Sequence, residues 1–286
     1  MLQQADWRAL GTGVRLLVHA GDIGAARDAV VRVLDDVDRT YSRFRDDSEL
    51  SLLNAASVAA ASSRVPVDLP VSPLLARALV GSLDAARQTG LEISSLAIGE
   101  MNSIPYKSDP RTIEWVSDCV DVMKALGVKV VLLAFFGKGD LRDDKPGTDE
   151  VVKRLKAVAP KAEKAGVIFG IESWLSAEAH MDIIQRVGSP AVKVYYDVCN
   201  SNDRGYDIYK EIRWLGTKHI CEFHMKENGS LLGQGKVDFQ KVRQAMDEIG
   251  YAGWMQIEGA VPKGAKMLDS YKANCQFLRG IFPKNA

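Results

Sequence analysis

The sequence predicts an α/β fold in which an incomplete or rearranged (β/α)8 barrel of the TIM type accompanies a smaller α+β segment at the N-terminal end. Six apolar, strand-like runs alternate with helical stretches over residues 91–286, which is the pattern of a parallel sheet. Residues 1–90 lack this repeat and differ from the rest of the chain in composition. Six strand–helix units are fewer than the eight that close such a barrel, so we expect an incomplete one.

The two parts differ most clearly in their basic residues. Residues 1–90 contain ten arginines and no lysine, whereas residues 91–286 contain eight arginines and nineteen lysines. Because lysine and arginine serve a solvated surface about equally well, folding alone does not explain this difference. We therefore predict two domains of separate origin, 1–90 and 91–286, joined near Thr89-Gly90-Leu91. The alternative is a single gene with a locally arginine-rich face.

Within residues 1–90 we predict the order strand, helix, linker, helix. Residues 13–20 alternate as a strand does, and residues 22–41 carry apolar side chains at helical spacing. The small residues at 55–63 indicate a linker, and residues 74–89 a second helix.

Within residues 91–286 each strand-like run is followed by a helix. The predicted strands are 91–98, 128–135, 167–172, 192–197, 219–224 and 253–258. The predicted starts of helices are Asp109-Pro110, Thr148, Ser176 and Asp238, and the predicted ends are Gly166, Gly188 and Gly250.

An incomplete barrel leaves two sheet edges open, and an open edge exposes unpaired backbone N–H and C=O groups. The strand at 13–20 is the strong strand outside the barrel. We expect it to dock against the strand at 91–98 or the strand at 253–258, and the alternative is a separate lobe.

Charge and cysteine content exclude several kinds of protein. Lys+Arg and Asp+Glu both number 37, so no basic excess attracts nucleic acid or an anionic membrane. No apolar run approaches the roughly 20 residues that span a bilayer. The four cysteines are widely spaced and no secretory segment follows Met1, which favours a cytoplasmic protein with reduced thiols.

Four potential metal ligands end four successive predicted strands: Glu172, Asp197, His224 and Glu258. Their spacing is about one strand–helix unit, so in a parallel barrel they meet at the carboxyl ends of the strands, where active sites of this fold lie. Three carboxylates and one imidazole form an oxygen-rich set that suits Mn²⁺, Mg²⁺ or Co²⁺, with Zn²⁺ also compatible. The alternative is that each is an ordinary solvated group at a strand end.

From about Leu91 to Phe282 the chain resembles the xylose isomerase-like sugar phosphate isomerase/epimerase family (AP endonuclease family 2). The resemblance rests on ALGVKVVLLAFFGKGDLR, GVIFGIES, VKVYYDVCNSND, HICEFHMKENGSLLGQGKVDF and YAGWMQIEG. It implies that the barrel lacks its first two units and that the four residues above hold one divalent ion. It also implies that Glu172 and Glu258 exchange a proton with the substrate through an enediolate.

Further residues are candidates for contact with the substrate. Asn102 follows the first strand of the barrel in a stretch that resembles the active-site rim of the family. Asn200 stands where related epimerases often carry a substrate-contacting His. Trp174 and Phe136 follow strands and form either a pocket wall or part of the core.

Lys226 lies two residues after His224 and therefore on the same strand face. Its ammonium could hold an anionic oxygen or phosphate of the substrate, or could form a salt bridge with Glu222 or Glu258. The LLGQG sequence that follows predicts a tight loop with glycines at 233 and 235.

Residues 1–90 resemble the start of the FAD:protein FMN transferase (ApbE-like) family, through LGTGVRLLV, YSRFRDDSELSLLNAAS and SPLLARALVGSLDAARQTG. The later flavin-transferase motifs are replaced by the isomerase-like sequence, so we expect no flavin transfer. This segment would therefore be a truncated piece of such an enzyme, and the whole chain a hybrid.

The sequence thus predicts metal-dependent isomerisation or epimerisation of a small sugar, a sugar phosphate or a polyol ketone, with a homo-oligomer among the options for its assembly. Two alternatives remain open: a non-catalytic hybrid that retains the metal site, and residual binding of a flavin nucleotide by residues 1–90.

Overall fold

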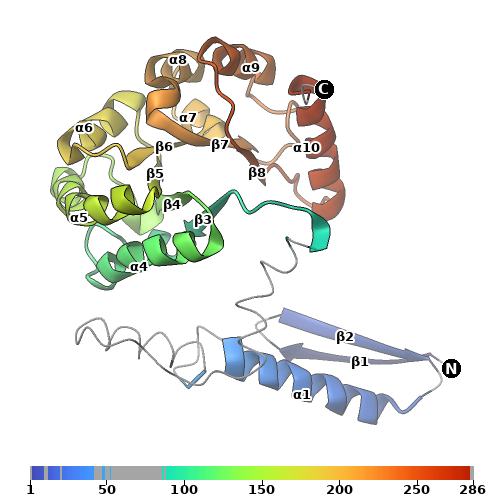
Figure 1. Ribbon diagram of the computed structural model, residues 1–286. Coiled ribbons are helices and arrows are strands. Elements are labelled where there is room, and N and C mark those ends of the chain that lie inside the picture. Colours follow the sequence, from blue (N-terminus) through green and yellow to red (C-terminus); the bar gives the residue numbers. More distant parts are fainter. Residues whose placement is uncertain are drawn as a thin grey trace. The chain divides into compact units, whose positions relative to one another are not determined.

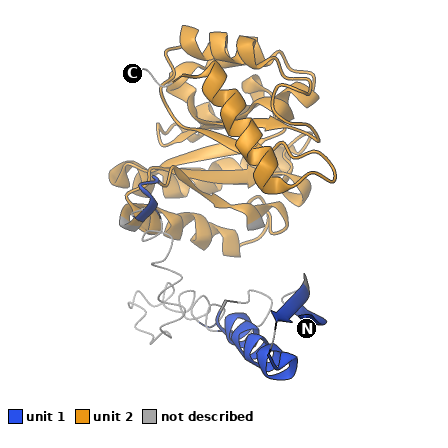
Figure 2. Ribbon diagram, turned by 90° about the vertical axis from the view of Figure 1, so that its right-hand side faces the viewer, with its two compact units in different colours: residues 1–92 blue, residues 93–286 orange. Residues whose placement is uncertain are grey.

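The structure is a computed structural model of the chain, and it describes residues 2–9, 12–19, 21–41, 47, 48, 52, 86 and 88–283. The chain divides into two compact units, Met1–Glu92 and Ile93–Ala286, which Figure 2 shows in blue and orange. The predicted linker at 55–63 lies outside the described residues, as does nearly all of the predicted helix at 74–89. That the two parts have separate origins stays a prediction.

In the described part of the first unit, two antiparallel strands are followed by helix α1 (Figure 1). Strand β1 (Leu2–Ala9) pairs with β2 (Thr12–His19) along its whole length. Helix α1 (Ile23–Tyr41) begins where the sequence predicts, because Oδ1 of Asp22 accepts hydrogen bonds from two backbone N–H groups of the first turn, at 2.8 and 3.2 Å.

Two sequence predictions about the first unit are wrong. No strand is predicted over residues 2–9, since half of their side chains are polar and none is β-branched. The docking of residues 13–20 on the barrel sheet is not observed either. Among the described strands β2 pairs with β1 alone, so the partner of this strand is the local segment that the sequence pattern missed.

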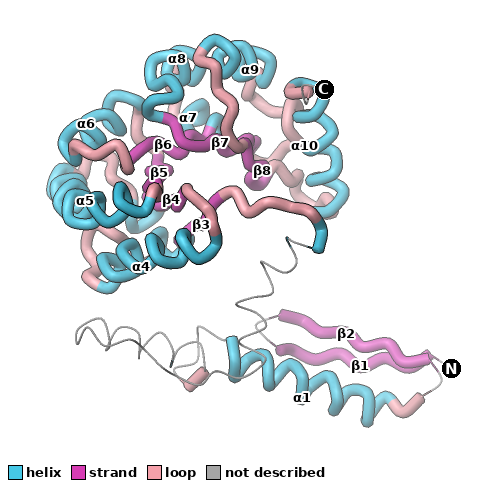
Figure 3. The backbone as a smooth tube through the Cα atoms, viewed as in Figure 1, coloured by secondary structure: helices cyan, strands magenta, loops and turns pink. Residues whose placement is uncertain are grey.

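In the second unit six parallel strands form one curved sheet (Figure 3). Each strand pairs with the next one along the chain. The strands are β3 (Ser95–Ile98), β4 (Val130–Phe135), β5 (Ile168–Ser173), β6 (Val192–Asp197), β7 (Ile220–Glu227) and β8 (Met255–Gly259). The prediction of an incomplete TIM-type α/β barrel is confirmed: the sheet is curled into a half-barrel.

Helices alternate with the strands and cover the outer face of the sheet (Figure 1). They are α4 (Arg111–Leu126), α5 (Lys145–Ala165), α6 (Ala177–Val187), α7 (Val198–Asp203), α8 (Ile208–His219), α9 (Phe239–Glu248) and α10 (Met267–Ile281), with the short 3-10 helices η1 (Gly99–Asn102) and η2 (Gly137–Gly139). None of the described helices is both long enough and apolar enough to cross a membrane.

Most helix ends carry the predicted caps. The side chains of Ser176 and Asp238 accept hydrogen bonds from backbone N–H groups in the first turns of α6 and α9. Gly166 and Gly188 end α5 and α6 in the left-handed conformation that glycine adopts without strain.

The predicted N-cap Thr148 is wrong, because it lies inside α5. The helix begins one turn earlier at Asp144, whose side chain accepts a hydrogen bond from the N–H of Gly147 at 2.9 Å. Pro146 stands in the first turn, where a helix does not need the missing N–H group.

Both faces of the sheet are buried, as is usual for parallel strands flanked by helices. Alternate residues of β4 show the division. Val131 and Phe135 pack outward in the large core beneath the helices, whereas Leu132 and Ala134 belong to a smaller inner cluster with Tyr195. The inner cluster fills part of the concave side of the sheet, so apolar side chains pack beneath the carboxyl ends of the strands.

Strands β3 and β8 are the edges of the sheet. Side chains connect these edges in place of backbone pairing. Nε2 of Gln256 on β8 donates hydrogen bonds to Oγ of Ser94 and Oγ of Ser95, at 2.7 and 2.6 Å, and lies 3.1 Å from Oε2 of Glu222. The sheet therefore curls far enough for a β8 side chain to reach the start of β3.

The loop between β7 and α9 depends on two glycines, in agreement with the tight loop that LLGQG predicts. Gly233 has a φ of +78°, and a Cβ atom there would overlap the ring of Phe277 in α10. A Cβ atom at Gly235 would overlap the carboxylate of Glu227, which accepts hydrogen bonds from two backbone N–H groups further along the loop.

We predict that Gly233→Ala lowers the free energy of unfolding by about 2–4 kcal/mol, because alanine adds left-handed strain and an overlap with Phe277. Gly280→Ala is the matched control, since a Cβ atom in the last turn of α10 meets no neighbour. The control should stabilise the protein by about 0.5–1 kcal/mol. Urea unfolding followed by circular dichroism measures both, and equal midpoints for the two variants would contradict the role of Gly233.

Candidate metal centre and active site

Four side chains converge at the carboxyl ends of neighbouring strands. Glu172 lies at the end of β5, Asp197 at the end of β6, His224 on β7 and Glu258 at the end of β8. Each offers one potential ligand atom, and these four atoms lie within 4.8 Å of one another. The strand-end spacing in the sequence thus corresponds to one compact group in space.

His224 connects the two glutamates of this group. Its Nδ1 atom lies 3.0 Å from Oε1 of Glu172 and 3.5 Å from Oε2 of Glu258. The ring of Tyr195 packs against the imidazole, with the ring centres 4.6 Å apart. Glu172 and His224 are buried, whereas the side chain of Glu258 on the edge strand is 44% exposed.

Asp197 has one satisfied and one unsatisfied carboxylate oxygen. It is the N-cap of α7, and its Oδ1 accepts hydrogen bonds from the backbone N–H groups of Cys199 and Asn200, both at 2.8 Å. Its Oδ2 is buried and has no hydrogen-bond partner. An unsatisfied buried oxygen is costly. The donor set and this oxygen together fit a divalent cation.

Lys226 is the nearest cation to this group among the described residues. Its Nζ lies 2.7 Å from Oε2 of Glu258 and 3.5 Å from Oδ2 of Asp197. The sequence left open a salt bridge with Glu222 or with Glu258, and the structure selects Glu258. Glu222 instead accepts a hydrogen bond from Gln256.

The surroundings shift the pKa values of this group in opposite directions. Burial raises the pKa of Asp197 to about 7, although Lys226 opposes the rise. Burial alone would lower the pKa of His224, but the hydrogen bond that its Nδ1–H donates to Glu172 and the nearby carboxylates outweigh burial and raise that pKa. Burial alone would raise the pKa of Glu258, but the charges of His224 and Lys226 outweigh burial and lower that pKa.

A cavity of about 480 Å³ opens beside the four residues. Its lining includes all the candidate substrate contacts: Asn102, Asn200, Trp174, Lys226 and Phe136. The rings of Phe136 and Trp174 meet edge to face with their centres 5.1 Å apart, and form an aromatic wall. Oδ1 of Asn102 accepts a hydrogen bond from the N–H of Phe136 at 3.2 Å, which fixes the amide at the rim.

Two further polar residues of this lining, Gln256 and Ser95, were not predicted from the sequence. Gln256 lies two residues before Glu258 on the same strand, so the two-residue period of a strand places both side chains on one face. The two-residue period could therefore have identified Gln256 from the sequence. Ser95 had no comparable signal, because its role depends on how far the sheet curls.

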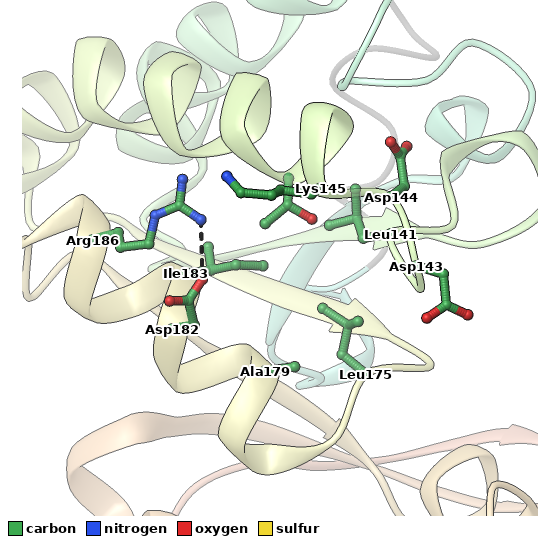
Figure 4. Close-up of a pocket in the computed structure, with 10 residues that line it drawn as sticks. Leu141, Asp143, Asp144, Lys145, Leu175, Ala179, Asp182, Ile183 and Arg186 are labelled. Carbon is green, nitrogen blue, oxygen red and sulfur yellow. Dashed lines mark hydrogen bonds and ion pairs between the residues drawn. The ribbon is translucent and has the colours of Figure 1, made fainter.

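A second and larger cavity, of about 850 Å³, lies beside α6 and the start of α5 (Figure 4). Its cations are already paired: Arg186 with Asp182 at 3.0 Å and Lys145 with Asp149 at 2.8 Å. The metal-ligand group lies in the smaller cavity, so size alone does not identify the active site.

Comparison with known proteins gives a family match over most of the chain. The model of the xylose isomerase-like TIM barrel matches residues 59–281. This span contains all six strands of the curved sheet and crosses the join predicted near residue 90. The comparisons give no support to a flavin-transferase segment or to a hybrid, and that resemblance stays a prediction.

Several curated relatives are epimerases. The 2-epi-5-epi-valiolone 7-phosphate 2-epimerase of Actinoplanes sp. is 24% identical over 172 residues, which are 56% of this chain and 62% of that protein. The D-psicose 3-epimerase of Enterocloster bolteae is 25% identical over 134 residues, which are 43% of this chain and 44% of that protein. The chain thus spans less than two thirds of the length of these two relatives.

Solved structures of sugar epimerases share the fold. The 3-keto-D-glucoside 4-epimerase of E. coli superposes with a TM-score of 0.61 and 15% identity, over 71% of this chain and 86% of that one. The D-psicose 3-epimerase of Clostridium cellulolyticum H10, determined with D-tagatose, superposes with a TM-score of 0.61 and 19% identity. The match covers 85% of this chain and 96% of that one.

We predict that Asp197→Asn stabilises the metal-depleted protein more at about pH 8 than at about pH 5. The pKa of Asp197 is raised on folding from 3.8 to about 7, so the folded chain binds this proton more tightly, and stability is lost as the pH rises through that window. Asparagine retains an acceptor for the α7 amides and does not ionise.

Thermal unfolding in EDTA at the two pH values measures this effect. Asp182→Asn is the matched control, because it makes the same change on the exposed surface of α6. If Asp197→Asn changes the midpoint equally at both pH values, the raised pKa of Asp197 is wrong.

Proposed function

Because the chain belongs to the xylose isomerase-like TIM barrel family, we propose that it is a metal-dependent enzyme that epimerises or isomerises a small sugar or sugar phosphate. The observation that carries the proposal is the convergence of four ligand atoms within 4.8 Å at the mouth of the half-barrel. The buried Oδ2 of Asp197, which has no hydrogen-bond partner, supports it, since a divalent cation would satisfy this oxygen. The epimerase relatives favour epimerisation over isomerisation.

Glu172, Asp197, His224 and Glu258 would hold one divalent cation. Their oxygen-rich set favours Mn²⁺, Mg²⁺ or Co²⁺, and Zn²⁺ also accepts such ligands. When bound, the cation polarises the carbonyl and hydroxyl oxygens of the substrate and offsets the negative charge of the carboxylates.

Glu172 and Glu258 are the proposed proton-transfer residues. A base removes the proton from the carbon beside the carbonyl group, which leaves an enediolate, and an acid returns a proton to it. Epimerisation requires the return to occur on the opposite face of that carbon. Glu172 and Glu258 come from different strands and flank His224, so they can approach the substrate from different directions.

The remaining polar lining of the cavity would bind the substrate. The amides of Asn102 and Asn200 can donate to and accept from sugar hydroxyl groups. The indole of Trp174 offers an apolar surface to the C–H face of a sugar. Lys226 provides a charged donor to a substrate oxygen or to a phosphate group.

Solvent exchange tests the proposal most directly. The Mn²⁺-loaded protein is incubated in D₂O with a panel of ketoses and ketose phosphates, including D-psicose and L-ribulose. The proposal requires deuterium at the carbon beside the carbonyl group, together with an epimeric or isomeric product. Stoichiometric metal binding without exchange of any panel member would favour the alternative, a chain that keeps the metal site without a competent active site.

We predict that Glu258→Gln lowers turnover of the identified substrate by roughly 10²–10⁴-fold, since it removes a proton-transfer group. The fold and most of the metal affinity should remain, because glutamine keeps one carbonyl oxygen as a ligand. Glu248→Gln, at a surface ion pair with Arg213, is the matched control and should retain full turnover. Unchanged turnover by Glu258→Gln would remove Glu258 from the mechanism.

A further inference from the structure

Lys226 lines the cavity and also contacts the group of four clustered residues directly. Its ammonium contacts two of the four clustered carboxylate and imidazole residues, with Nζ 2.7 Å from Glu258 and 3.5 Å from Asp197. The Asp197 oxygen that it approaches is the buried Oδ2 that lacks a hydrogen-bond partner. The side chain of Lys226 is only 17% exposed, so solvent screens these interactions weakly.

The strands fix this position. Lys226 is directly opposite Glu258 in the parallel pairing of β7 with β8, and Asp197 is opposite His224 in the pairing of β6 with β7. Because side chains two residues apart share one face of a strand, Lys226 and His224 point into the same group. The contact therefore follows from the register of the sheet, and no flexible loop is involved.

An ammonium and a divalent cation that both bind these oxygens repel each other. A cation held by carboxylate oxygens lies about 2.0–2.6 Å from them. An ammonium in its present contact with Glu258 would then lie within about 5 Å of the cation, where like charges repel strongly in a poorly screened site. Either the ammonium moves away or the cation binds more weakly.

We infer that Lys226 is a built-in counter-ion of the cluster, which competes with the divalent cation for Glu258 and Asp197 and thereby sets the metal affinity of the site. This inference rests on the metal site of the proposed function. In the absence of the cation, Lys226 offsets the repulsion among Glu172, Asp197 and Glu258 and keeps Glu258 in the group. Binding of the cation displaces the ammonium from Glu258.

Metal titration and thermal unfolding of Lys226→Met test the inference. We expect Lys226→Met to bind Mn²⁺ roughly tenfold more tightly by isothermal titration calorimetry, because the competing charge is gone. In EDTA its unfolding midpoint should fall below that of the wild type, while in saturating Mn²⁺ it should equal or exceed it. A purely structural lysine would lower the midpoint under both conditions.

Two further variants sharpen the comparison. Lys226→Arg keeps the charge and should keep a Mn²⁺ affinity close to that of the wild type. Lys193→Met removes the same charge from β6, where the ammonium faces the carbonyl oxygen of Thr217 at 3.4 Å, and should change neither the affinity nor the midpoints.

Each outcome decides a separate point. Wild-type protein that binds Mn²⁺ while Lys226→Met binds it equally or more weakly overturns the inference and leaves the proposed function standing. Tighter binding by Lys226→Met supports the inference, including the case in which the wild type binds too weakly to detect. If neither protein binds Mn²⁺, Co²⁺ or Mg²⁺, both the inference and the proposed metal site are wrong.

Discussion

The concentration of negative charge at the carboxyl ends of β5 to β8 is the constraint on which the rest of the site depends. Three carboxylates meet there, of which Glu172 and Asp197 are buried, and like charges in such surroundings raise one another's energy. The fold offsets this negative charge only in part. The amides of α7 bind one oxygen of Asp197, His224 lies between two carboxylates, and Lys226 neutralises a third of the charge. A divalent cation would offset more of this negative charge than the ammonium of Lys226 does.

The half-barrel holds most of this group on its central strands. Glu172, Asp197 and His224 stand on β5, β6 and β7, which are central strands with neighbours on both sides. Beneath them the inner face is filled by apolar side chains of β4 and by Tyr195, which packs against the imidazole. A sheet of six strands therefore holds three of the four residues as a closed barrel would, although among the described strands β3 and β8 each pair on one side only.

The sequence predicted the strand ends well, because parallel strands buried on both faces form clear apolar runs and their spacing follows the strand–helix repeat. The convergence of Glu172 and Glu258 could be expected for that reason. Predictions that depended on contacts between segments far apart in the sequence were less accurate. The docking of residues 13–20 was wrong because a polar, weakly patterned β1 supplied a local partner. The link from Gln256 to Ser95 depends on the curvature of the sheet, which no local pattern encodes.

Glu172 and Glu258 differ in exposure because the sheet is open. Glu172 lies on a central strand and is buried, whereas Glu258 lies on the edge strand β8, with nearly half of its side chain exposed. Burial and a hydrogen bond to His224 hold Glu172 in one place. Glu258 is held chiefly by the charges of His224 and Lys226, and those charges lower its pKa. The position of Glu258 is thus governed by electrostatics more than by packing, so any change in the cations around it changes the geometry of the site directly.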